Sequence, residues 1–214
     1  MKLRKQLQKI PKTVFLAIYL ILVMFPFYWM LNTSLKASMT ELYSFPVTYL
    51  PESPSLANYV EILWKGNFLT YIRNSFLYSS IASIIAVAIG LCAAYVLSRF
   101  EFPGKRALLI FFLVTQMIPL FTILAPQYQI LSKLKLRNTA FVLPLLYINM
   151  CIPFSVVTLR GFYANVPVSL EEAAQIDGCT RIGAMVRVAL PIMKPGIAAT
   201  VIFNFINSWN ELFM

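Results

Sequence analysis

Residues 74–98 read NSFLYSSIASIIAVAIGLCAAYVLS, an uncharged run of 25 residues between Arg73 and Arg99. The apolar core of a bilayer is about 30 Å thick, and an α-helix needs about 20 apolar residues to cross it. The rest of the chain has the same character, since 59% of its 214 residues are hydrophobic, against roughly 45–50% in globular proteins. The sequence therefore predicts an integral membrane protein.

Four further uncharged intervals are long enough, or nearly long enough, to cross the bilayer. They contain 23, 26, 22 and 16 residues and cover 13–35, 107–132, 138–159 and 195–210. The last one reaches a spanning length only if the span tolerates Glu211 and continues to Met214. We therefore expect an all-α membrane fold with a cytoplasmic basic arm at residues 1–12 and five spans, at about 13–31, 75–97, 107–125, 140–159 and 196–214.

The distribution of basic residues predicts the orientation. The chain has 18 Lys and Arg against 8 Asp and Glu, a net charge of +10. The excess could indicate nucleic acid, but the apolar intervals between the charges favour anionic lipid headgroups. With the N-terminus in the cytoplasm, 12 of the 18 basic residues lie inside, in agreement with the positive-inside rule. Lys133–Arg137 breaks this trend, so we interpret Gln127–Leu136 as an interfacial segment that turns three apolar residues to the lipid, Ile130, Leu131 and Leu134.

The sequence lacks the residue patterns that catalysis or metal binding requires. There is no histidine, and Cys92, Cys151 and Cys179 have neither metal-ligand nor disulfide spacing. A phosphate-binding Walker A loop needs Gly-x4-Gly-Lys-Ser/Thr, whereas Gly104-Lys105 is followed by arginine and lacks the earlier glycine. We therefore expect no enzymatic activity, no catalytic residue, no metal and no cofactor bound by this chain.

The connection between the fourth and fifth spans, residues 160–195, is the one long polar stretch with regular helix signals. Ser169 and Glu172 form the Ser-x-x-Glu pattern of a capping box, which predicts the start of a helix. Asp177-Gly178 predicts its end, because glycine readily takes the left-handed conformation that follows a helix. We expect this connection to lie on the cytoplasmic surface of the membrane.

A second short helix is predicted over Arg181–Ala189, and Leu190-Pro191 is expected to stop it before the chain re-enters the membrane. In the first helix, the small side chains of Ala173 and Ala174 would let another protein's backbone approach closely. Three acidic residues would offer acceptors to a basic partner: Glu171, Glu172 and Asp177. The pattern fits a docking surface and a capped amphipathic loop lying on the headgroups equally well.

Polar side chains are concentrated in the predicted fifth span, where they are costly unless they face a cavity or another helix. They are Asn204, Asn207, Ser208, Trp209, Asn210 and Glu211. Amides, carboxylates and aromatic rings bind sugars by hydrogen bonding and stacking, but polar groups also join one membrane helix to another. A translocation pathway and a subunit interface both remain open. Pro119, Pro144 and Pro153, in the third and fourth spans, favour helices packed around a cavity or neighbours.

The polar connection resembles a known family motif. Glu172-Ala173-Ala174, three residues, Gly178, nine residues and Val188-Ala189-Leu190-Pro191 match the EAA loop of permease subunits in binding-protein-dependent ABC importers, with valine where isoleucine is commoner. The flanking residues resemble the carbohydrate branch with its MalG-like subunits, over nearly the whole chain. These stretches are Leu56-Ala57-Asn58-Tyr59, Arg73-Asn74-Ser75, Ala94-Tyr95-Val96-Leu97-Ser98-Arg99-Phe100, Phe102-Pro103-Gly104, Leu136-Arg137-Asn138-Thr139, Leu159-Arg160-Gly161-Phe162-Tyr163 and Asn207-Ser208-Trp209-Asn210-Glu211.

The resemblance implies a type I ABC importer fold, with residues 13–214 as one permease domain in a bacterial inner membrane. It implies a second permease subunit, expected to be a distinct homologue, and two ATPase subunits that hold ATP and Mg. An extracytoplasmic binding protein would deliver a sugar or oligosaccharide. Glu172 would accept a hydrogen bond from a basic ATPase residue. The whole set of ATPase-coupling residues would be Glu171, Glu172, Ala173, Ala174, Asp177, Gly178, Leu190 and Pro191.

Three alternatives remain: an ABC permease for a polyol or glycerol phosphate, a secondary transporter, and a membrane scaffold that transports nothing. A secondary transporter should show an inverted repeat and ionisable residues at mid-membrane, whereas spans one to four have no charge in their apolar intervals. The family normally has a sixth span and a cytoplasmic tail. Because this chain stops at Met214, we expect a fragment or a natural truncation.

Overall fold

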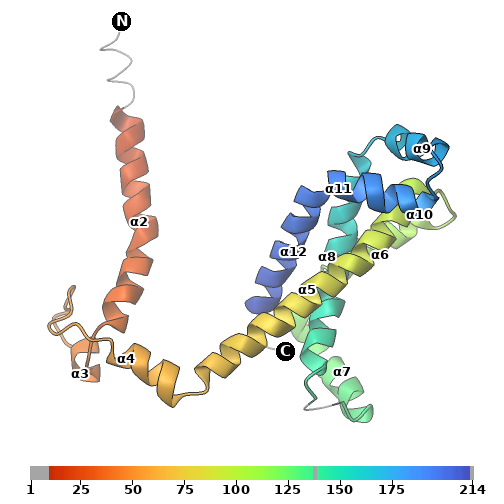
Figure 1. The fold of residues 1–214 in the computed structure, drawn as a ribbon. Coiled ribbons are helices and arrows are strands. Elements are labelled where there is room, and N and C mark those ends of the chain that lie inside the picture. The colour runs from red at the N-terminus through yellow and green to blue at the C-terminus, as the bar shows by residue number, and fades with distance from the viewer. Residues whose placement is uncertain (1–9, 137–138, 213–214) are drawn as a thin grey trace, which may run out of the picture. The chain divides into compact units, whose positions relative to one another are not determined.

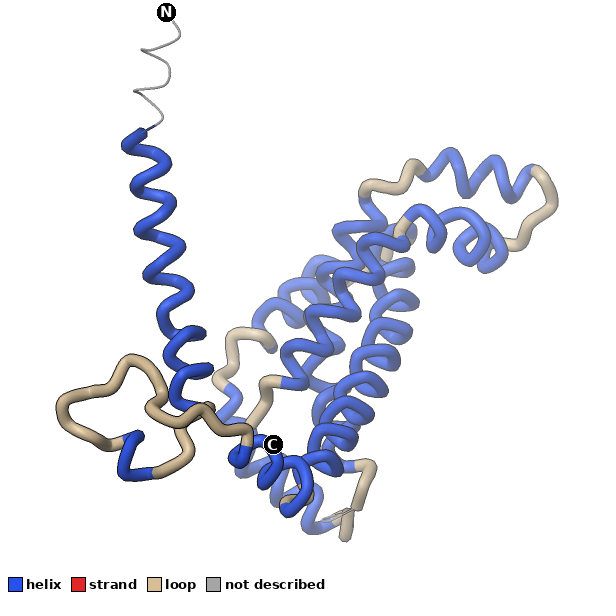
Figure 2. The backbone as a smooth tube through the Cα atoms, turned by 60° about the vertical axis from the view of Figure 1, so that its left-hand side comes forward, coloured by secondary structure: helices blue, strands red, loops and turns tan. Residues whose placement is uncertain are grey.

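The computed structural model of the protein describes residues 10–136 and 139–212. Over these ranges the regular elements are helices, accompanied by one isolated antiparallel bridge between Lys36 and Pro54 (Figure 2). Helices are expected in lipid because each satisfies its own backbone hydrogen bonds. The basic arm predicted at residues 1–12 falls largely outside the described residues, and Arg137 and Met214 also lie outside them.

The chain divides into two compact units, residues 1–71 and residues 72–214. In the first unit, α2 (Ile10–Ser34) contains the predicted first span, and short helical pieces follow it: α3 (Met39–Leu42), α4 (Ala57–Val60) and the π-helical η1 (Glu61–Lys65). The ammonium group of Lys36 donates hydrogen bonds to the carbonyl and hydroxyl oxygens of Thr48, at 3.0 and 2.8 Å. The Asn58 amide donates to the backbone carbonyls of Ser34 and Lys36. Polar contacts thus order the segment after α2.

The second unit begins within α5 (Phe68–Arg99) and contains the remaining helices. They are α6 (Lys105–Thr115), α7 (Leu120–Lys133), α8 (Val142–Ala164), α9 (Val168–Ile176), α10 (Arg181–Ala184), the π-helical η2 (Met185–Ala189), α11 (Leu190–Ile192) and α12 (Lys194–Trp209). α8 packs against both α6 and α12. Helices α9 to α11 lie at one end of this unit and α7 lies at the other (Figure 1).

Small side chains let α5 and α8 approach closely. Ala86, Gly90 and Ala94 recur at intervals of four on one buried face of α5, a spacing that brings helix backbones together in membranes. A Cβ atom added at Gly90 would lie only 2.7 Å from the Cβ atom of Ser155 on α8. Toward the α9 end, a buried apolar cluster continues this contact through Tyr95 of α5 and residues of α8 and η2.

Some of the predicted spans correspond to helices that are too short to cross a membrane. Within residues 10–136 and 139–212, three helices are long and apolar enough to cross a membrane: Pro11–Ser34, Phe68–Arg99 and Val142–Ala164. A fourth arises if Arg181–Ile192 and Lys194–Trp209, which meet at a bend of 76°, are taken as one span. The fold is therefore an all-helical membrane fold with three to four candidate spans, and the count of five stays a prediction.

The predicted third span, 107–125, is broken rather than continuous. It is divided between α6 and α7, which have 11 and 14 residues. Pro119 has extended backbone angles and precedes the first residue of α7, because proline lacks the N–H that would continue the helix. In the predicted interfacial segment, Ile130 and Leu134 are exposed, whereas Leu131 is buried. The prediction that Leu131 faces the lipid was therefore wrong.

The Gly90 contact predicts opposite effects for the same substitution at two helical glycines. Gly90→Ala should lower the unfolding free energy by about 1 to 3 kcal/mol, because its methyl group displaces the backbone around Ser155. Gly161→Ala on α8 meets nothing within 4 Å, and should raise stability by up to about 1 kcal/mol. Thermal unfolding of the purified protein in detergent measures both; equal melting temperatures for the two variants would contradict the close packing.

Candidate functional site

Helix α9 has a defined end but a start that differs from the prediction. Gly178 has φ of +90° directly after the capping residue Asp177, and this left-handed turn ends the helix as predicted. The predicted capping box is not formed, because α9 starts at Val168 with Pro167 at the N-cap position and no side-chain cap. Ser169 therefore lies inside the first turn, where its hydroxyl cannot take the N-cap role.

One face of α9 is turned outward. Glu172, Ala173, Asp177 and Gly178 are exposed, and Ala174 is half-buried. These are five of the eight residues predicted to couple to an ATPase. An acidic side chain beside a small one on an exposed helix can accept a hydrogen bond from a basic group while allowing close backbone approach. Their role as coupling residues stays a prediction.

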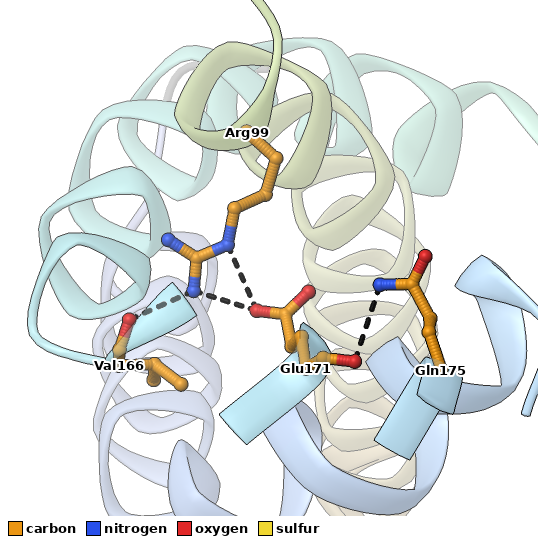
Figure 3. A network of polar contacts seen from close by, with 4 residues as sticks. All are labelled: Arg99, Val166, Glu171 and Gln175. Atoms are coloured by element: carbon orange, nitrogen blue, oxygen red, sulfur yellow. Dashed lines mark hydrogen bonds and ion pairs between the residues drawn. The ribbon is translucent and has the colours of Figure 1, made fainter. Parts of the chain in front are cut away.

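The neighbouring carboxylate, that of Glu171, points the other way. Its side chain is 4% exposed and its Oε1 accepts from the Arg99 Nε at 2.8 Å, with the Arg99 Nη2 at 2.6 Å (Figure 3). The same Nη2 donates to the backbone carbonyl of Val166 at 2.9 Å. The prediction that Glu171 offers its carboxylate to a basic partner is therefore corrected: in this structure the carboxylate is occupied by Arg99 of α5.

The second loop helix also contacts the end of α5. The guanidinium carbon of Arg181, in α10, lies 5.0 Å from the ring centroid of Phe100, the residue after α5. From there η2 and α11 continue to Ile192, so Leu190-Pro191 does not stop the helix as predicted; the chain turns at Met193 instead. Leu190 packs against the buried cluster and Pro191 is exposed. Proline is tolerated there because it lies in the first turn of α11.

A cleft of about 780 Å³ opens between α6, α7, α8 and α12. Its polar lining comprises Thr115, Gln116, Gln127, Asn149, Asn204, Asn207 and Glu211, and aromatic rings of Phe111, Phe112 and Phe154 stand beside them. This volume lies in the range of small-molecule sites. Sequence reasoning missed the contributions of α6, α7 and α8, although Gln116, Gln127 and Asn149 interrupt apolar intervals just as the asparagines of α12 do.

The polar residues of α12 have two different environments. Asn204 and Ser208 are buried against α8: the Asn204 amide donates to the Ser155 hydroxyl at 2.8 Å, and the Ser208 hydroxyl lies 3.5 Å from the Cys151 sulfur. Asn204 also borders the cleft, together with the exposed Asn207 and with Glu211, which follows the end of α12. The indole of Trp209 stacks on the ring of Phe205, and Asn210 is the exposed cap of α12. Polar contact between helices and cleft lining therefore occur on the same helix.

Comparison with known proteins identifies relatives of this chain. Residues 86–214 match the family described as binding-protein-dependent transport system inner membrane component. The diacetylchitobiose uptake system permease protein DasC of Streptomyces coelicolor is 36% identical over 190 residues, which are 89% of this chain and 68% of DasC. The sulfoquinovosyl glycerol transport system permease protein SmoH of Agrobacterium fabrum is 35% identical, with coverages of 94% and 70%. The trehalose/maltose transport system permease protein MalG of Thermococcus litoralis is 33% identical, with coverages of 89% and 68%.

A solved structure has the same fold. A chain in the crystal structure of a bacterial ABC transporter involved in the import of the acidic polysaccharide alginate superposes with a TM-score of 0.81. The match covers 97% of this chain and 72% of the other, at 21% sequence identity. The likeness shows that the helices are arranged as in the membrane part of an ABC importer.

The two environments on α12 predict different effects of removing an amide. Asn204→Ala should lower the unfolding free energy by about 1 kcal/mol, the order of a hydrogen bond between membrane helices. Asn207→Ala, at an exposed cleft position, should change it by less than about 0.5 kcal/mol. Melting temperatures in detergent distinguish the two, and an equal loss in both variants would mean that Asn207 is also structural.

Proposed function

Because this chain belongs to the family of binding-protein-dependent transport system inner membrane components, we propose that it forms part of the membrane passage of an ATP-driven importer for a sugar or oligosaccharide. Membership makes it a multi-pass inner membrane permease, a transport subunit without catalytic activity. It also implies an ATPase and a binding protein as partners. A second, distinct permease subunit and two ATPase copies complete the importer that we propose.

The observation that carries the coupling part of this proposal is the outward face of α9. The nine-residue helix α9 lies at one end of the second unit. Its inner face is bound to Arg99 of α5 through Glu171, and its outer face exposes Glu172 and Ala173. We propose that this face docks on an ATPase subunit, which alone holds ATP and Mg. Since ATP is hydrolysed in the cytoplasm, α9 then lies on the cytoplasmic side. With the predicted third span counted as a crossing, four spans separate the N-terminus from α9, so the N-terminus lies on that side too, in agreement with the count of basic residues.

The cleft supports a neutral sugar as the solute. Its amides can donate to and accept from hydroxyl groups, and its phenylalanine rings can stack on a sugar ring. Among the described residues that line it there is one carboxylate, Glu211, and no lysine or arginine. A site with this charge disfavours an anionic solute such as glycerol phosphate. The relatives named for diacetylchitobiose and for trehalose/maltose transport favour a neutral sugar, whereas SmoH is named for sulfoquinovosyl glycerol, a sulfonated sugar.

Uptake by cells that carry the complete transport system tests the solute class. With the permease gene intact, we expect accumulation of at least one of radiolabelled diacetylchitobiose, trehalose and maltose, and none of glycerol 3-phosphate. Deleting the permease gene should abolish the accumulation and restoring it should return it. Uptake of glycerol 3-phosphate alone would contradict the sugar assignment while leaving the permease function intact.

Reversal of one exposed charge tests the docking face. Glu172→Lys should weaken binding of the ATPase subunit by about 2 to 5 kcal/mol, because two positive groups then meet at a buried contact. The amount of permease in the membrane should stay unchanged, since Glu172 is exposed in the chain itself. Co-purification of the ATPase subunit measures the loss. Glu101→Lys is the control, a charge reversal at another exposed carboxylate, which pairs with Lys105 after the end of α5; wild-type co-purification with Glu172→Lys would rule out the docking role.

A further inference from the structure

The end of α5 contacts both α9 and α10, the two helices of the polar loop that connects α8 to α12 (residues 160–195). Arg99 binds Glu171 of α9 and the backbone carbonyl of Val166, which lies in the link between α8 and α9. From α10, Arg181 lies over the ring of Phe100. The Arg99 guanidinium also lies 5.9 Å from the ring centroid of Tyr163, near the end of α8. One guanidinium therefore contacts α9 and the link that carries it, as Figure 3 shows, and also a ring of α8.

This ion pair differs from the other ion pairs described in the chain. Lys65–Glu61 and Lys105–Glu101 join residues four apart, and their carboxylates are 66% and 89% exposed. Arg99 and Glu171 are 72 residues apart, with side chains 10% and 4% exposed. Burying two charges carries a desolvation cost that apolar side chains of similar volume avoid, so such a pair is weak evidence for a role in stability. What it provides is geometry, because two nitrogens of a planar guanidinium converge on one oxygen.

We propose that Arg99 and Glu171 are positioning residues that transmit a displacement of α9 into α5. The inference rests on the proposed function, which makes α9 the element that an ATPase subunit moves. A short helix connected by flexible links could shift without moving the membrane helices. Arg99 prevents this, since it fixes both α9 and the link at Val166 to the last turn of α5. Nucleotide-driven motion of α9 then turns or shifts α5 as one body with it.

The decisive variant replaces both charges at once. Arg99→Met with Glu171→Met fills the same space without leaving an unpaired buried charge, so the fold should persist, whereas either single methionine variant would leave one. The complex of the permease with its ATPase subunits is placed in lipid nanodiscs. Backbone amide hydrogen exchange is then followed in α9 and in residues 90–99 of α5, without nucleotide and with ATP plus vanadate.

In the wild-type complex, nucleotide should change exchange in α9 and in α5 together. In the double methionine variant, we expect the α9 change to remain and the α5 change to fall by about tenfold, a size typical of energetic coupling through packed side chains. The control, Lys65→Met with Glu61→Met, removes an ion pair whose two side chains are 75% and 66% exposed and should leave the α5 response at the wild-type level.

Two results would overturn the proposal: an α5 response of wild-type size in the double methionine variant, or no α5 response in a wild-type complex that has bound its ATPase subunits. A wild-type permease that binds no ATPase subunit contradicts the proposed function instead, so the two failures are distinguishable. Should the double variant not fold, Glu171→Gln keeps the volume and one acceptor oxygen. It should reduce the α5 response without abolishing it, and an unchanged response would again overturn the proposal.

Discussion

The close approach of α5 and α8 at Gly90 and Ser155 is the constraint from which the placement of the loop between α8 and α12 follows. Gly90 leaves room for Ser155, and this contact fixes where the two helices end relative to each other. Nine residues beyond Gly90, about 14 Å along the helix, Arg99 reaches the point at which the chain leaves α8 for α9. A larger residue at position 90 would move that guanidinium away from Glu171. Tight packing within the membrane thus determines the position of the polar loop outside it.

The hydrophobic pattern predicts the helical membrane fold because a helix that crosses a bilayer needs about 20 consecutive apolar residues, a signal that is long enough to recognise in the sequence. The helix end at Gly178 follows from a single local requirement, a positive φ angle, and could be predicted for that reason. Local rules were insufficient at Pro119, which breaks the predicted third span, and at Ser169, where the helix starts too early for a capping box. The Arg99–Glu171 pair joins residues 72 apart in the chain, and neither residue carries a local sign of the other.

The two open interpretations of the α12 residues could have been separated by helix periodicity. Asn204 and Ser208 are four residues apart and share the face that packs on α8. Asn207 lines the cleft, which Asn204 borders as well, and Glu211 lies at the same cleft just beyond the end of α12. Residues four apart lie on the same side of a helix, so Asn204 and Ser208 form one polar stripe, and the exposed Asn207 lies outside it. Which side faces a cavity depends on the neighbouring helices, and a single span does not reveal it.

The adjacent carboxylates of Glu171 and Glu172 have a consequence for genetics. Successive residues of a helix are about 100° apart, which turns one of these side chains into the protein and the other out of it. Loss-of-transport mutations at the two positions would look alike in a screen, yet their suppressors would map differently. In the proposed importer, compensating changes for position 171 would lie in this gene, at or near codon 99, whereas those for position 172 would lie in the gene of the ATPase subunit proposed to cover α9.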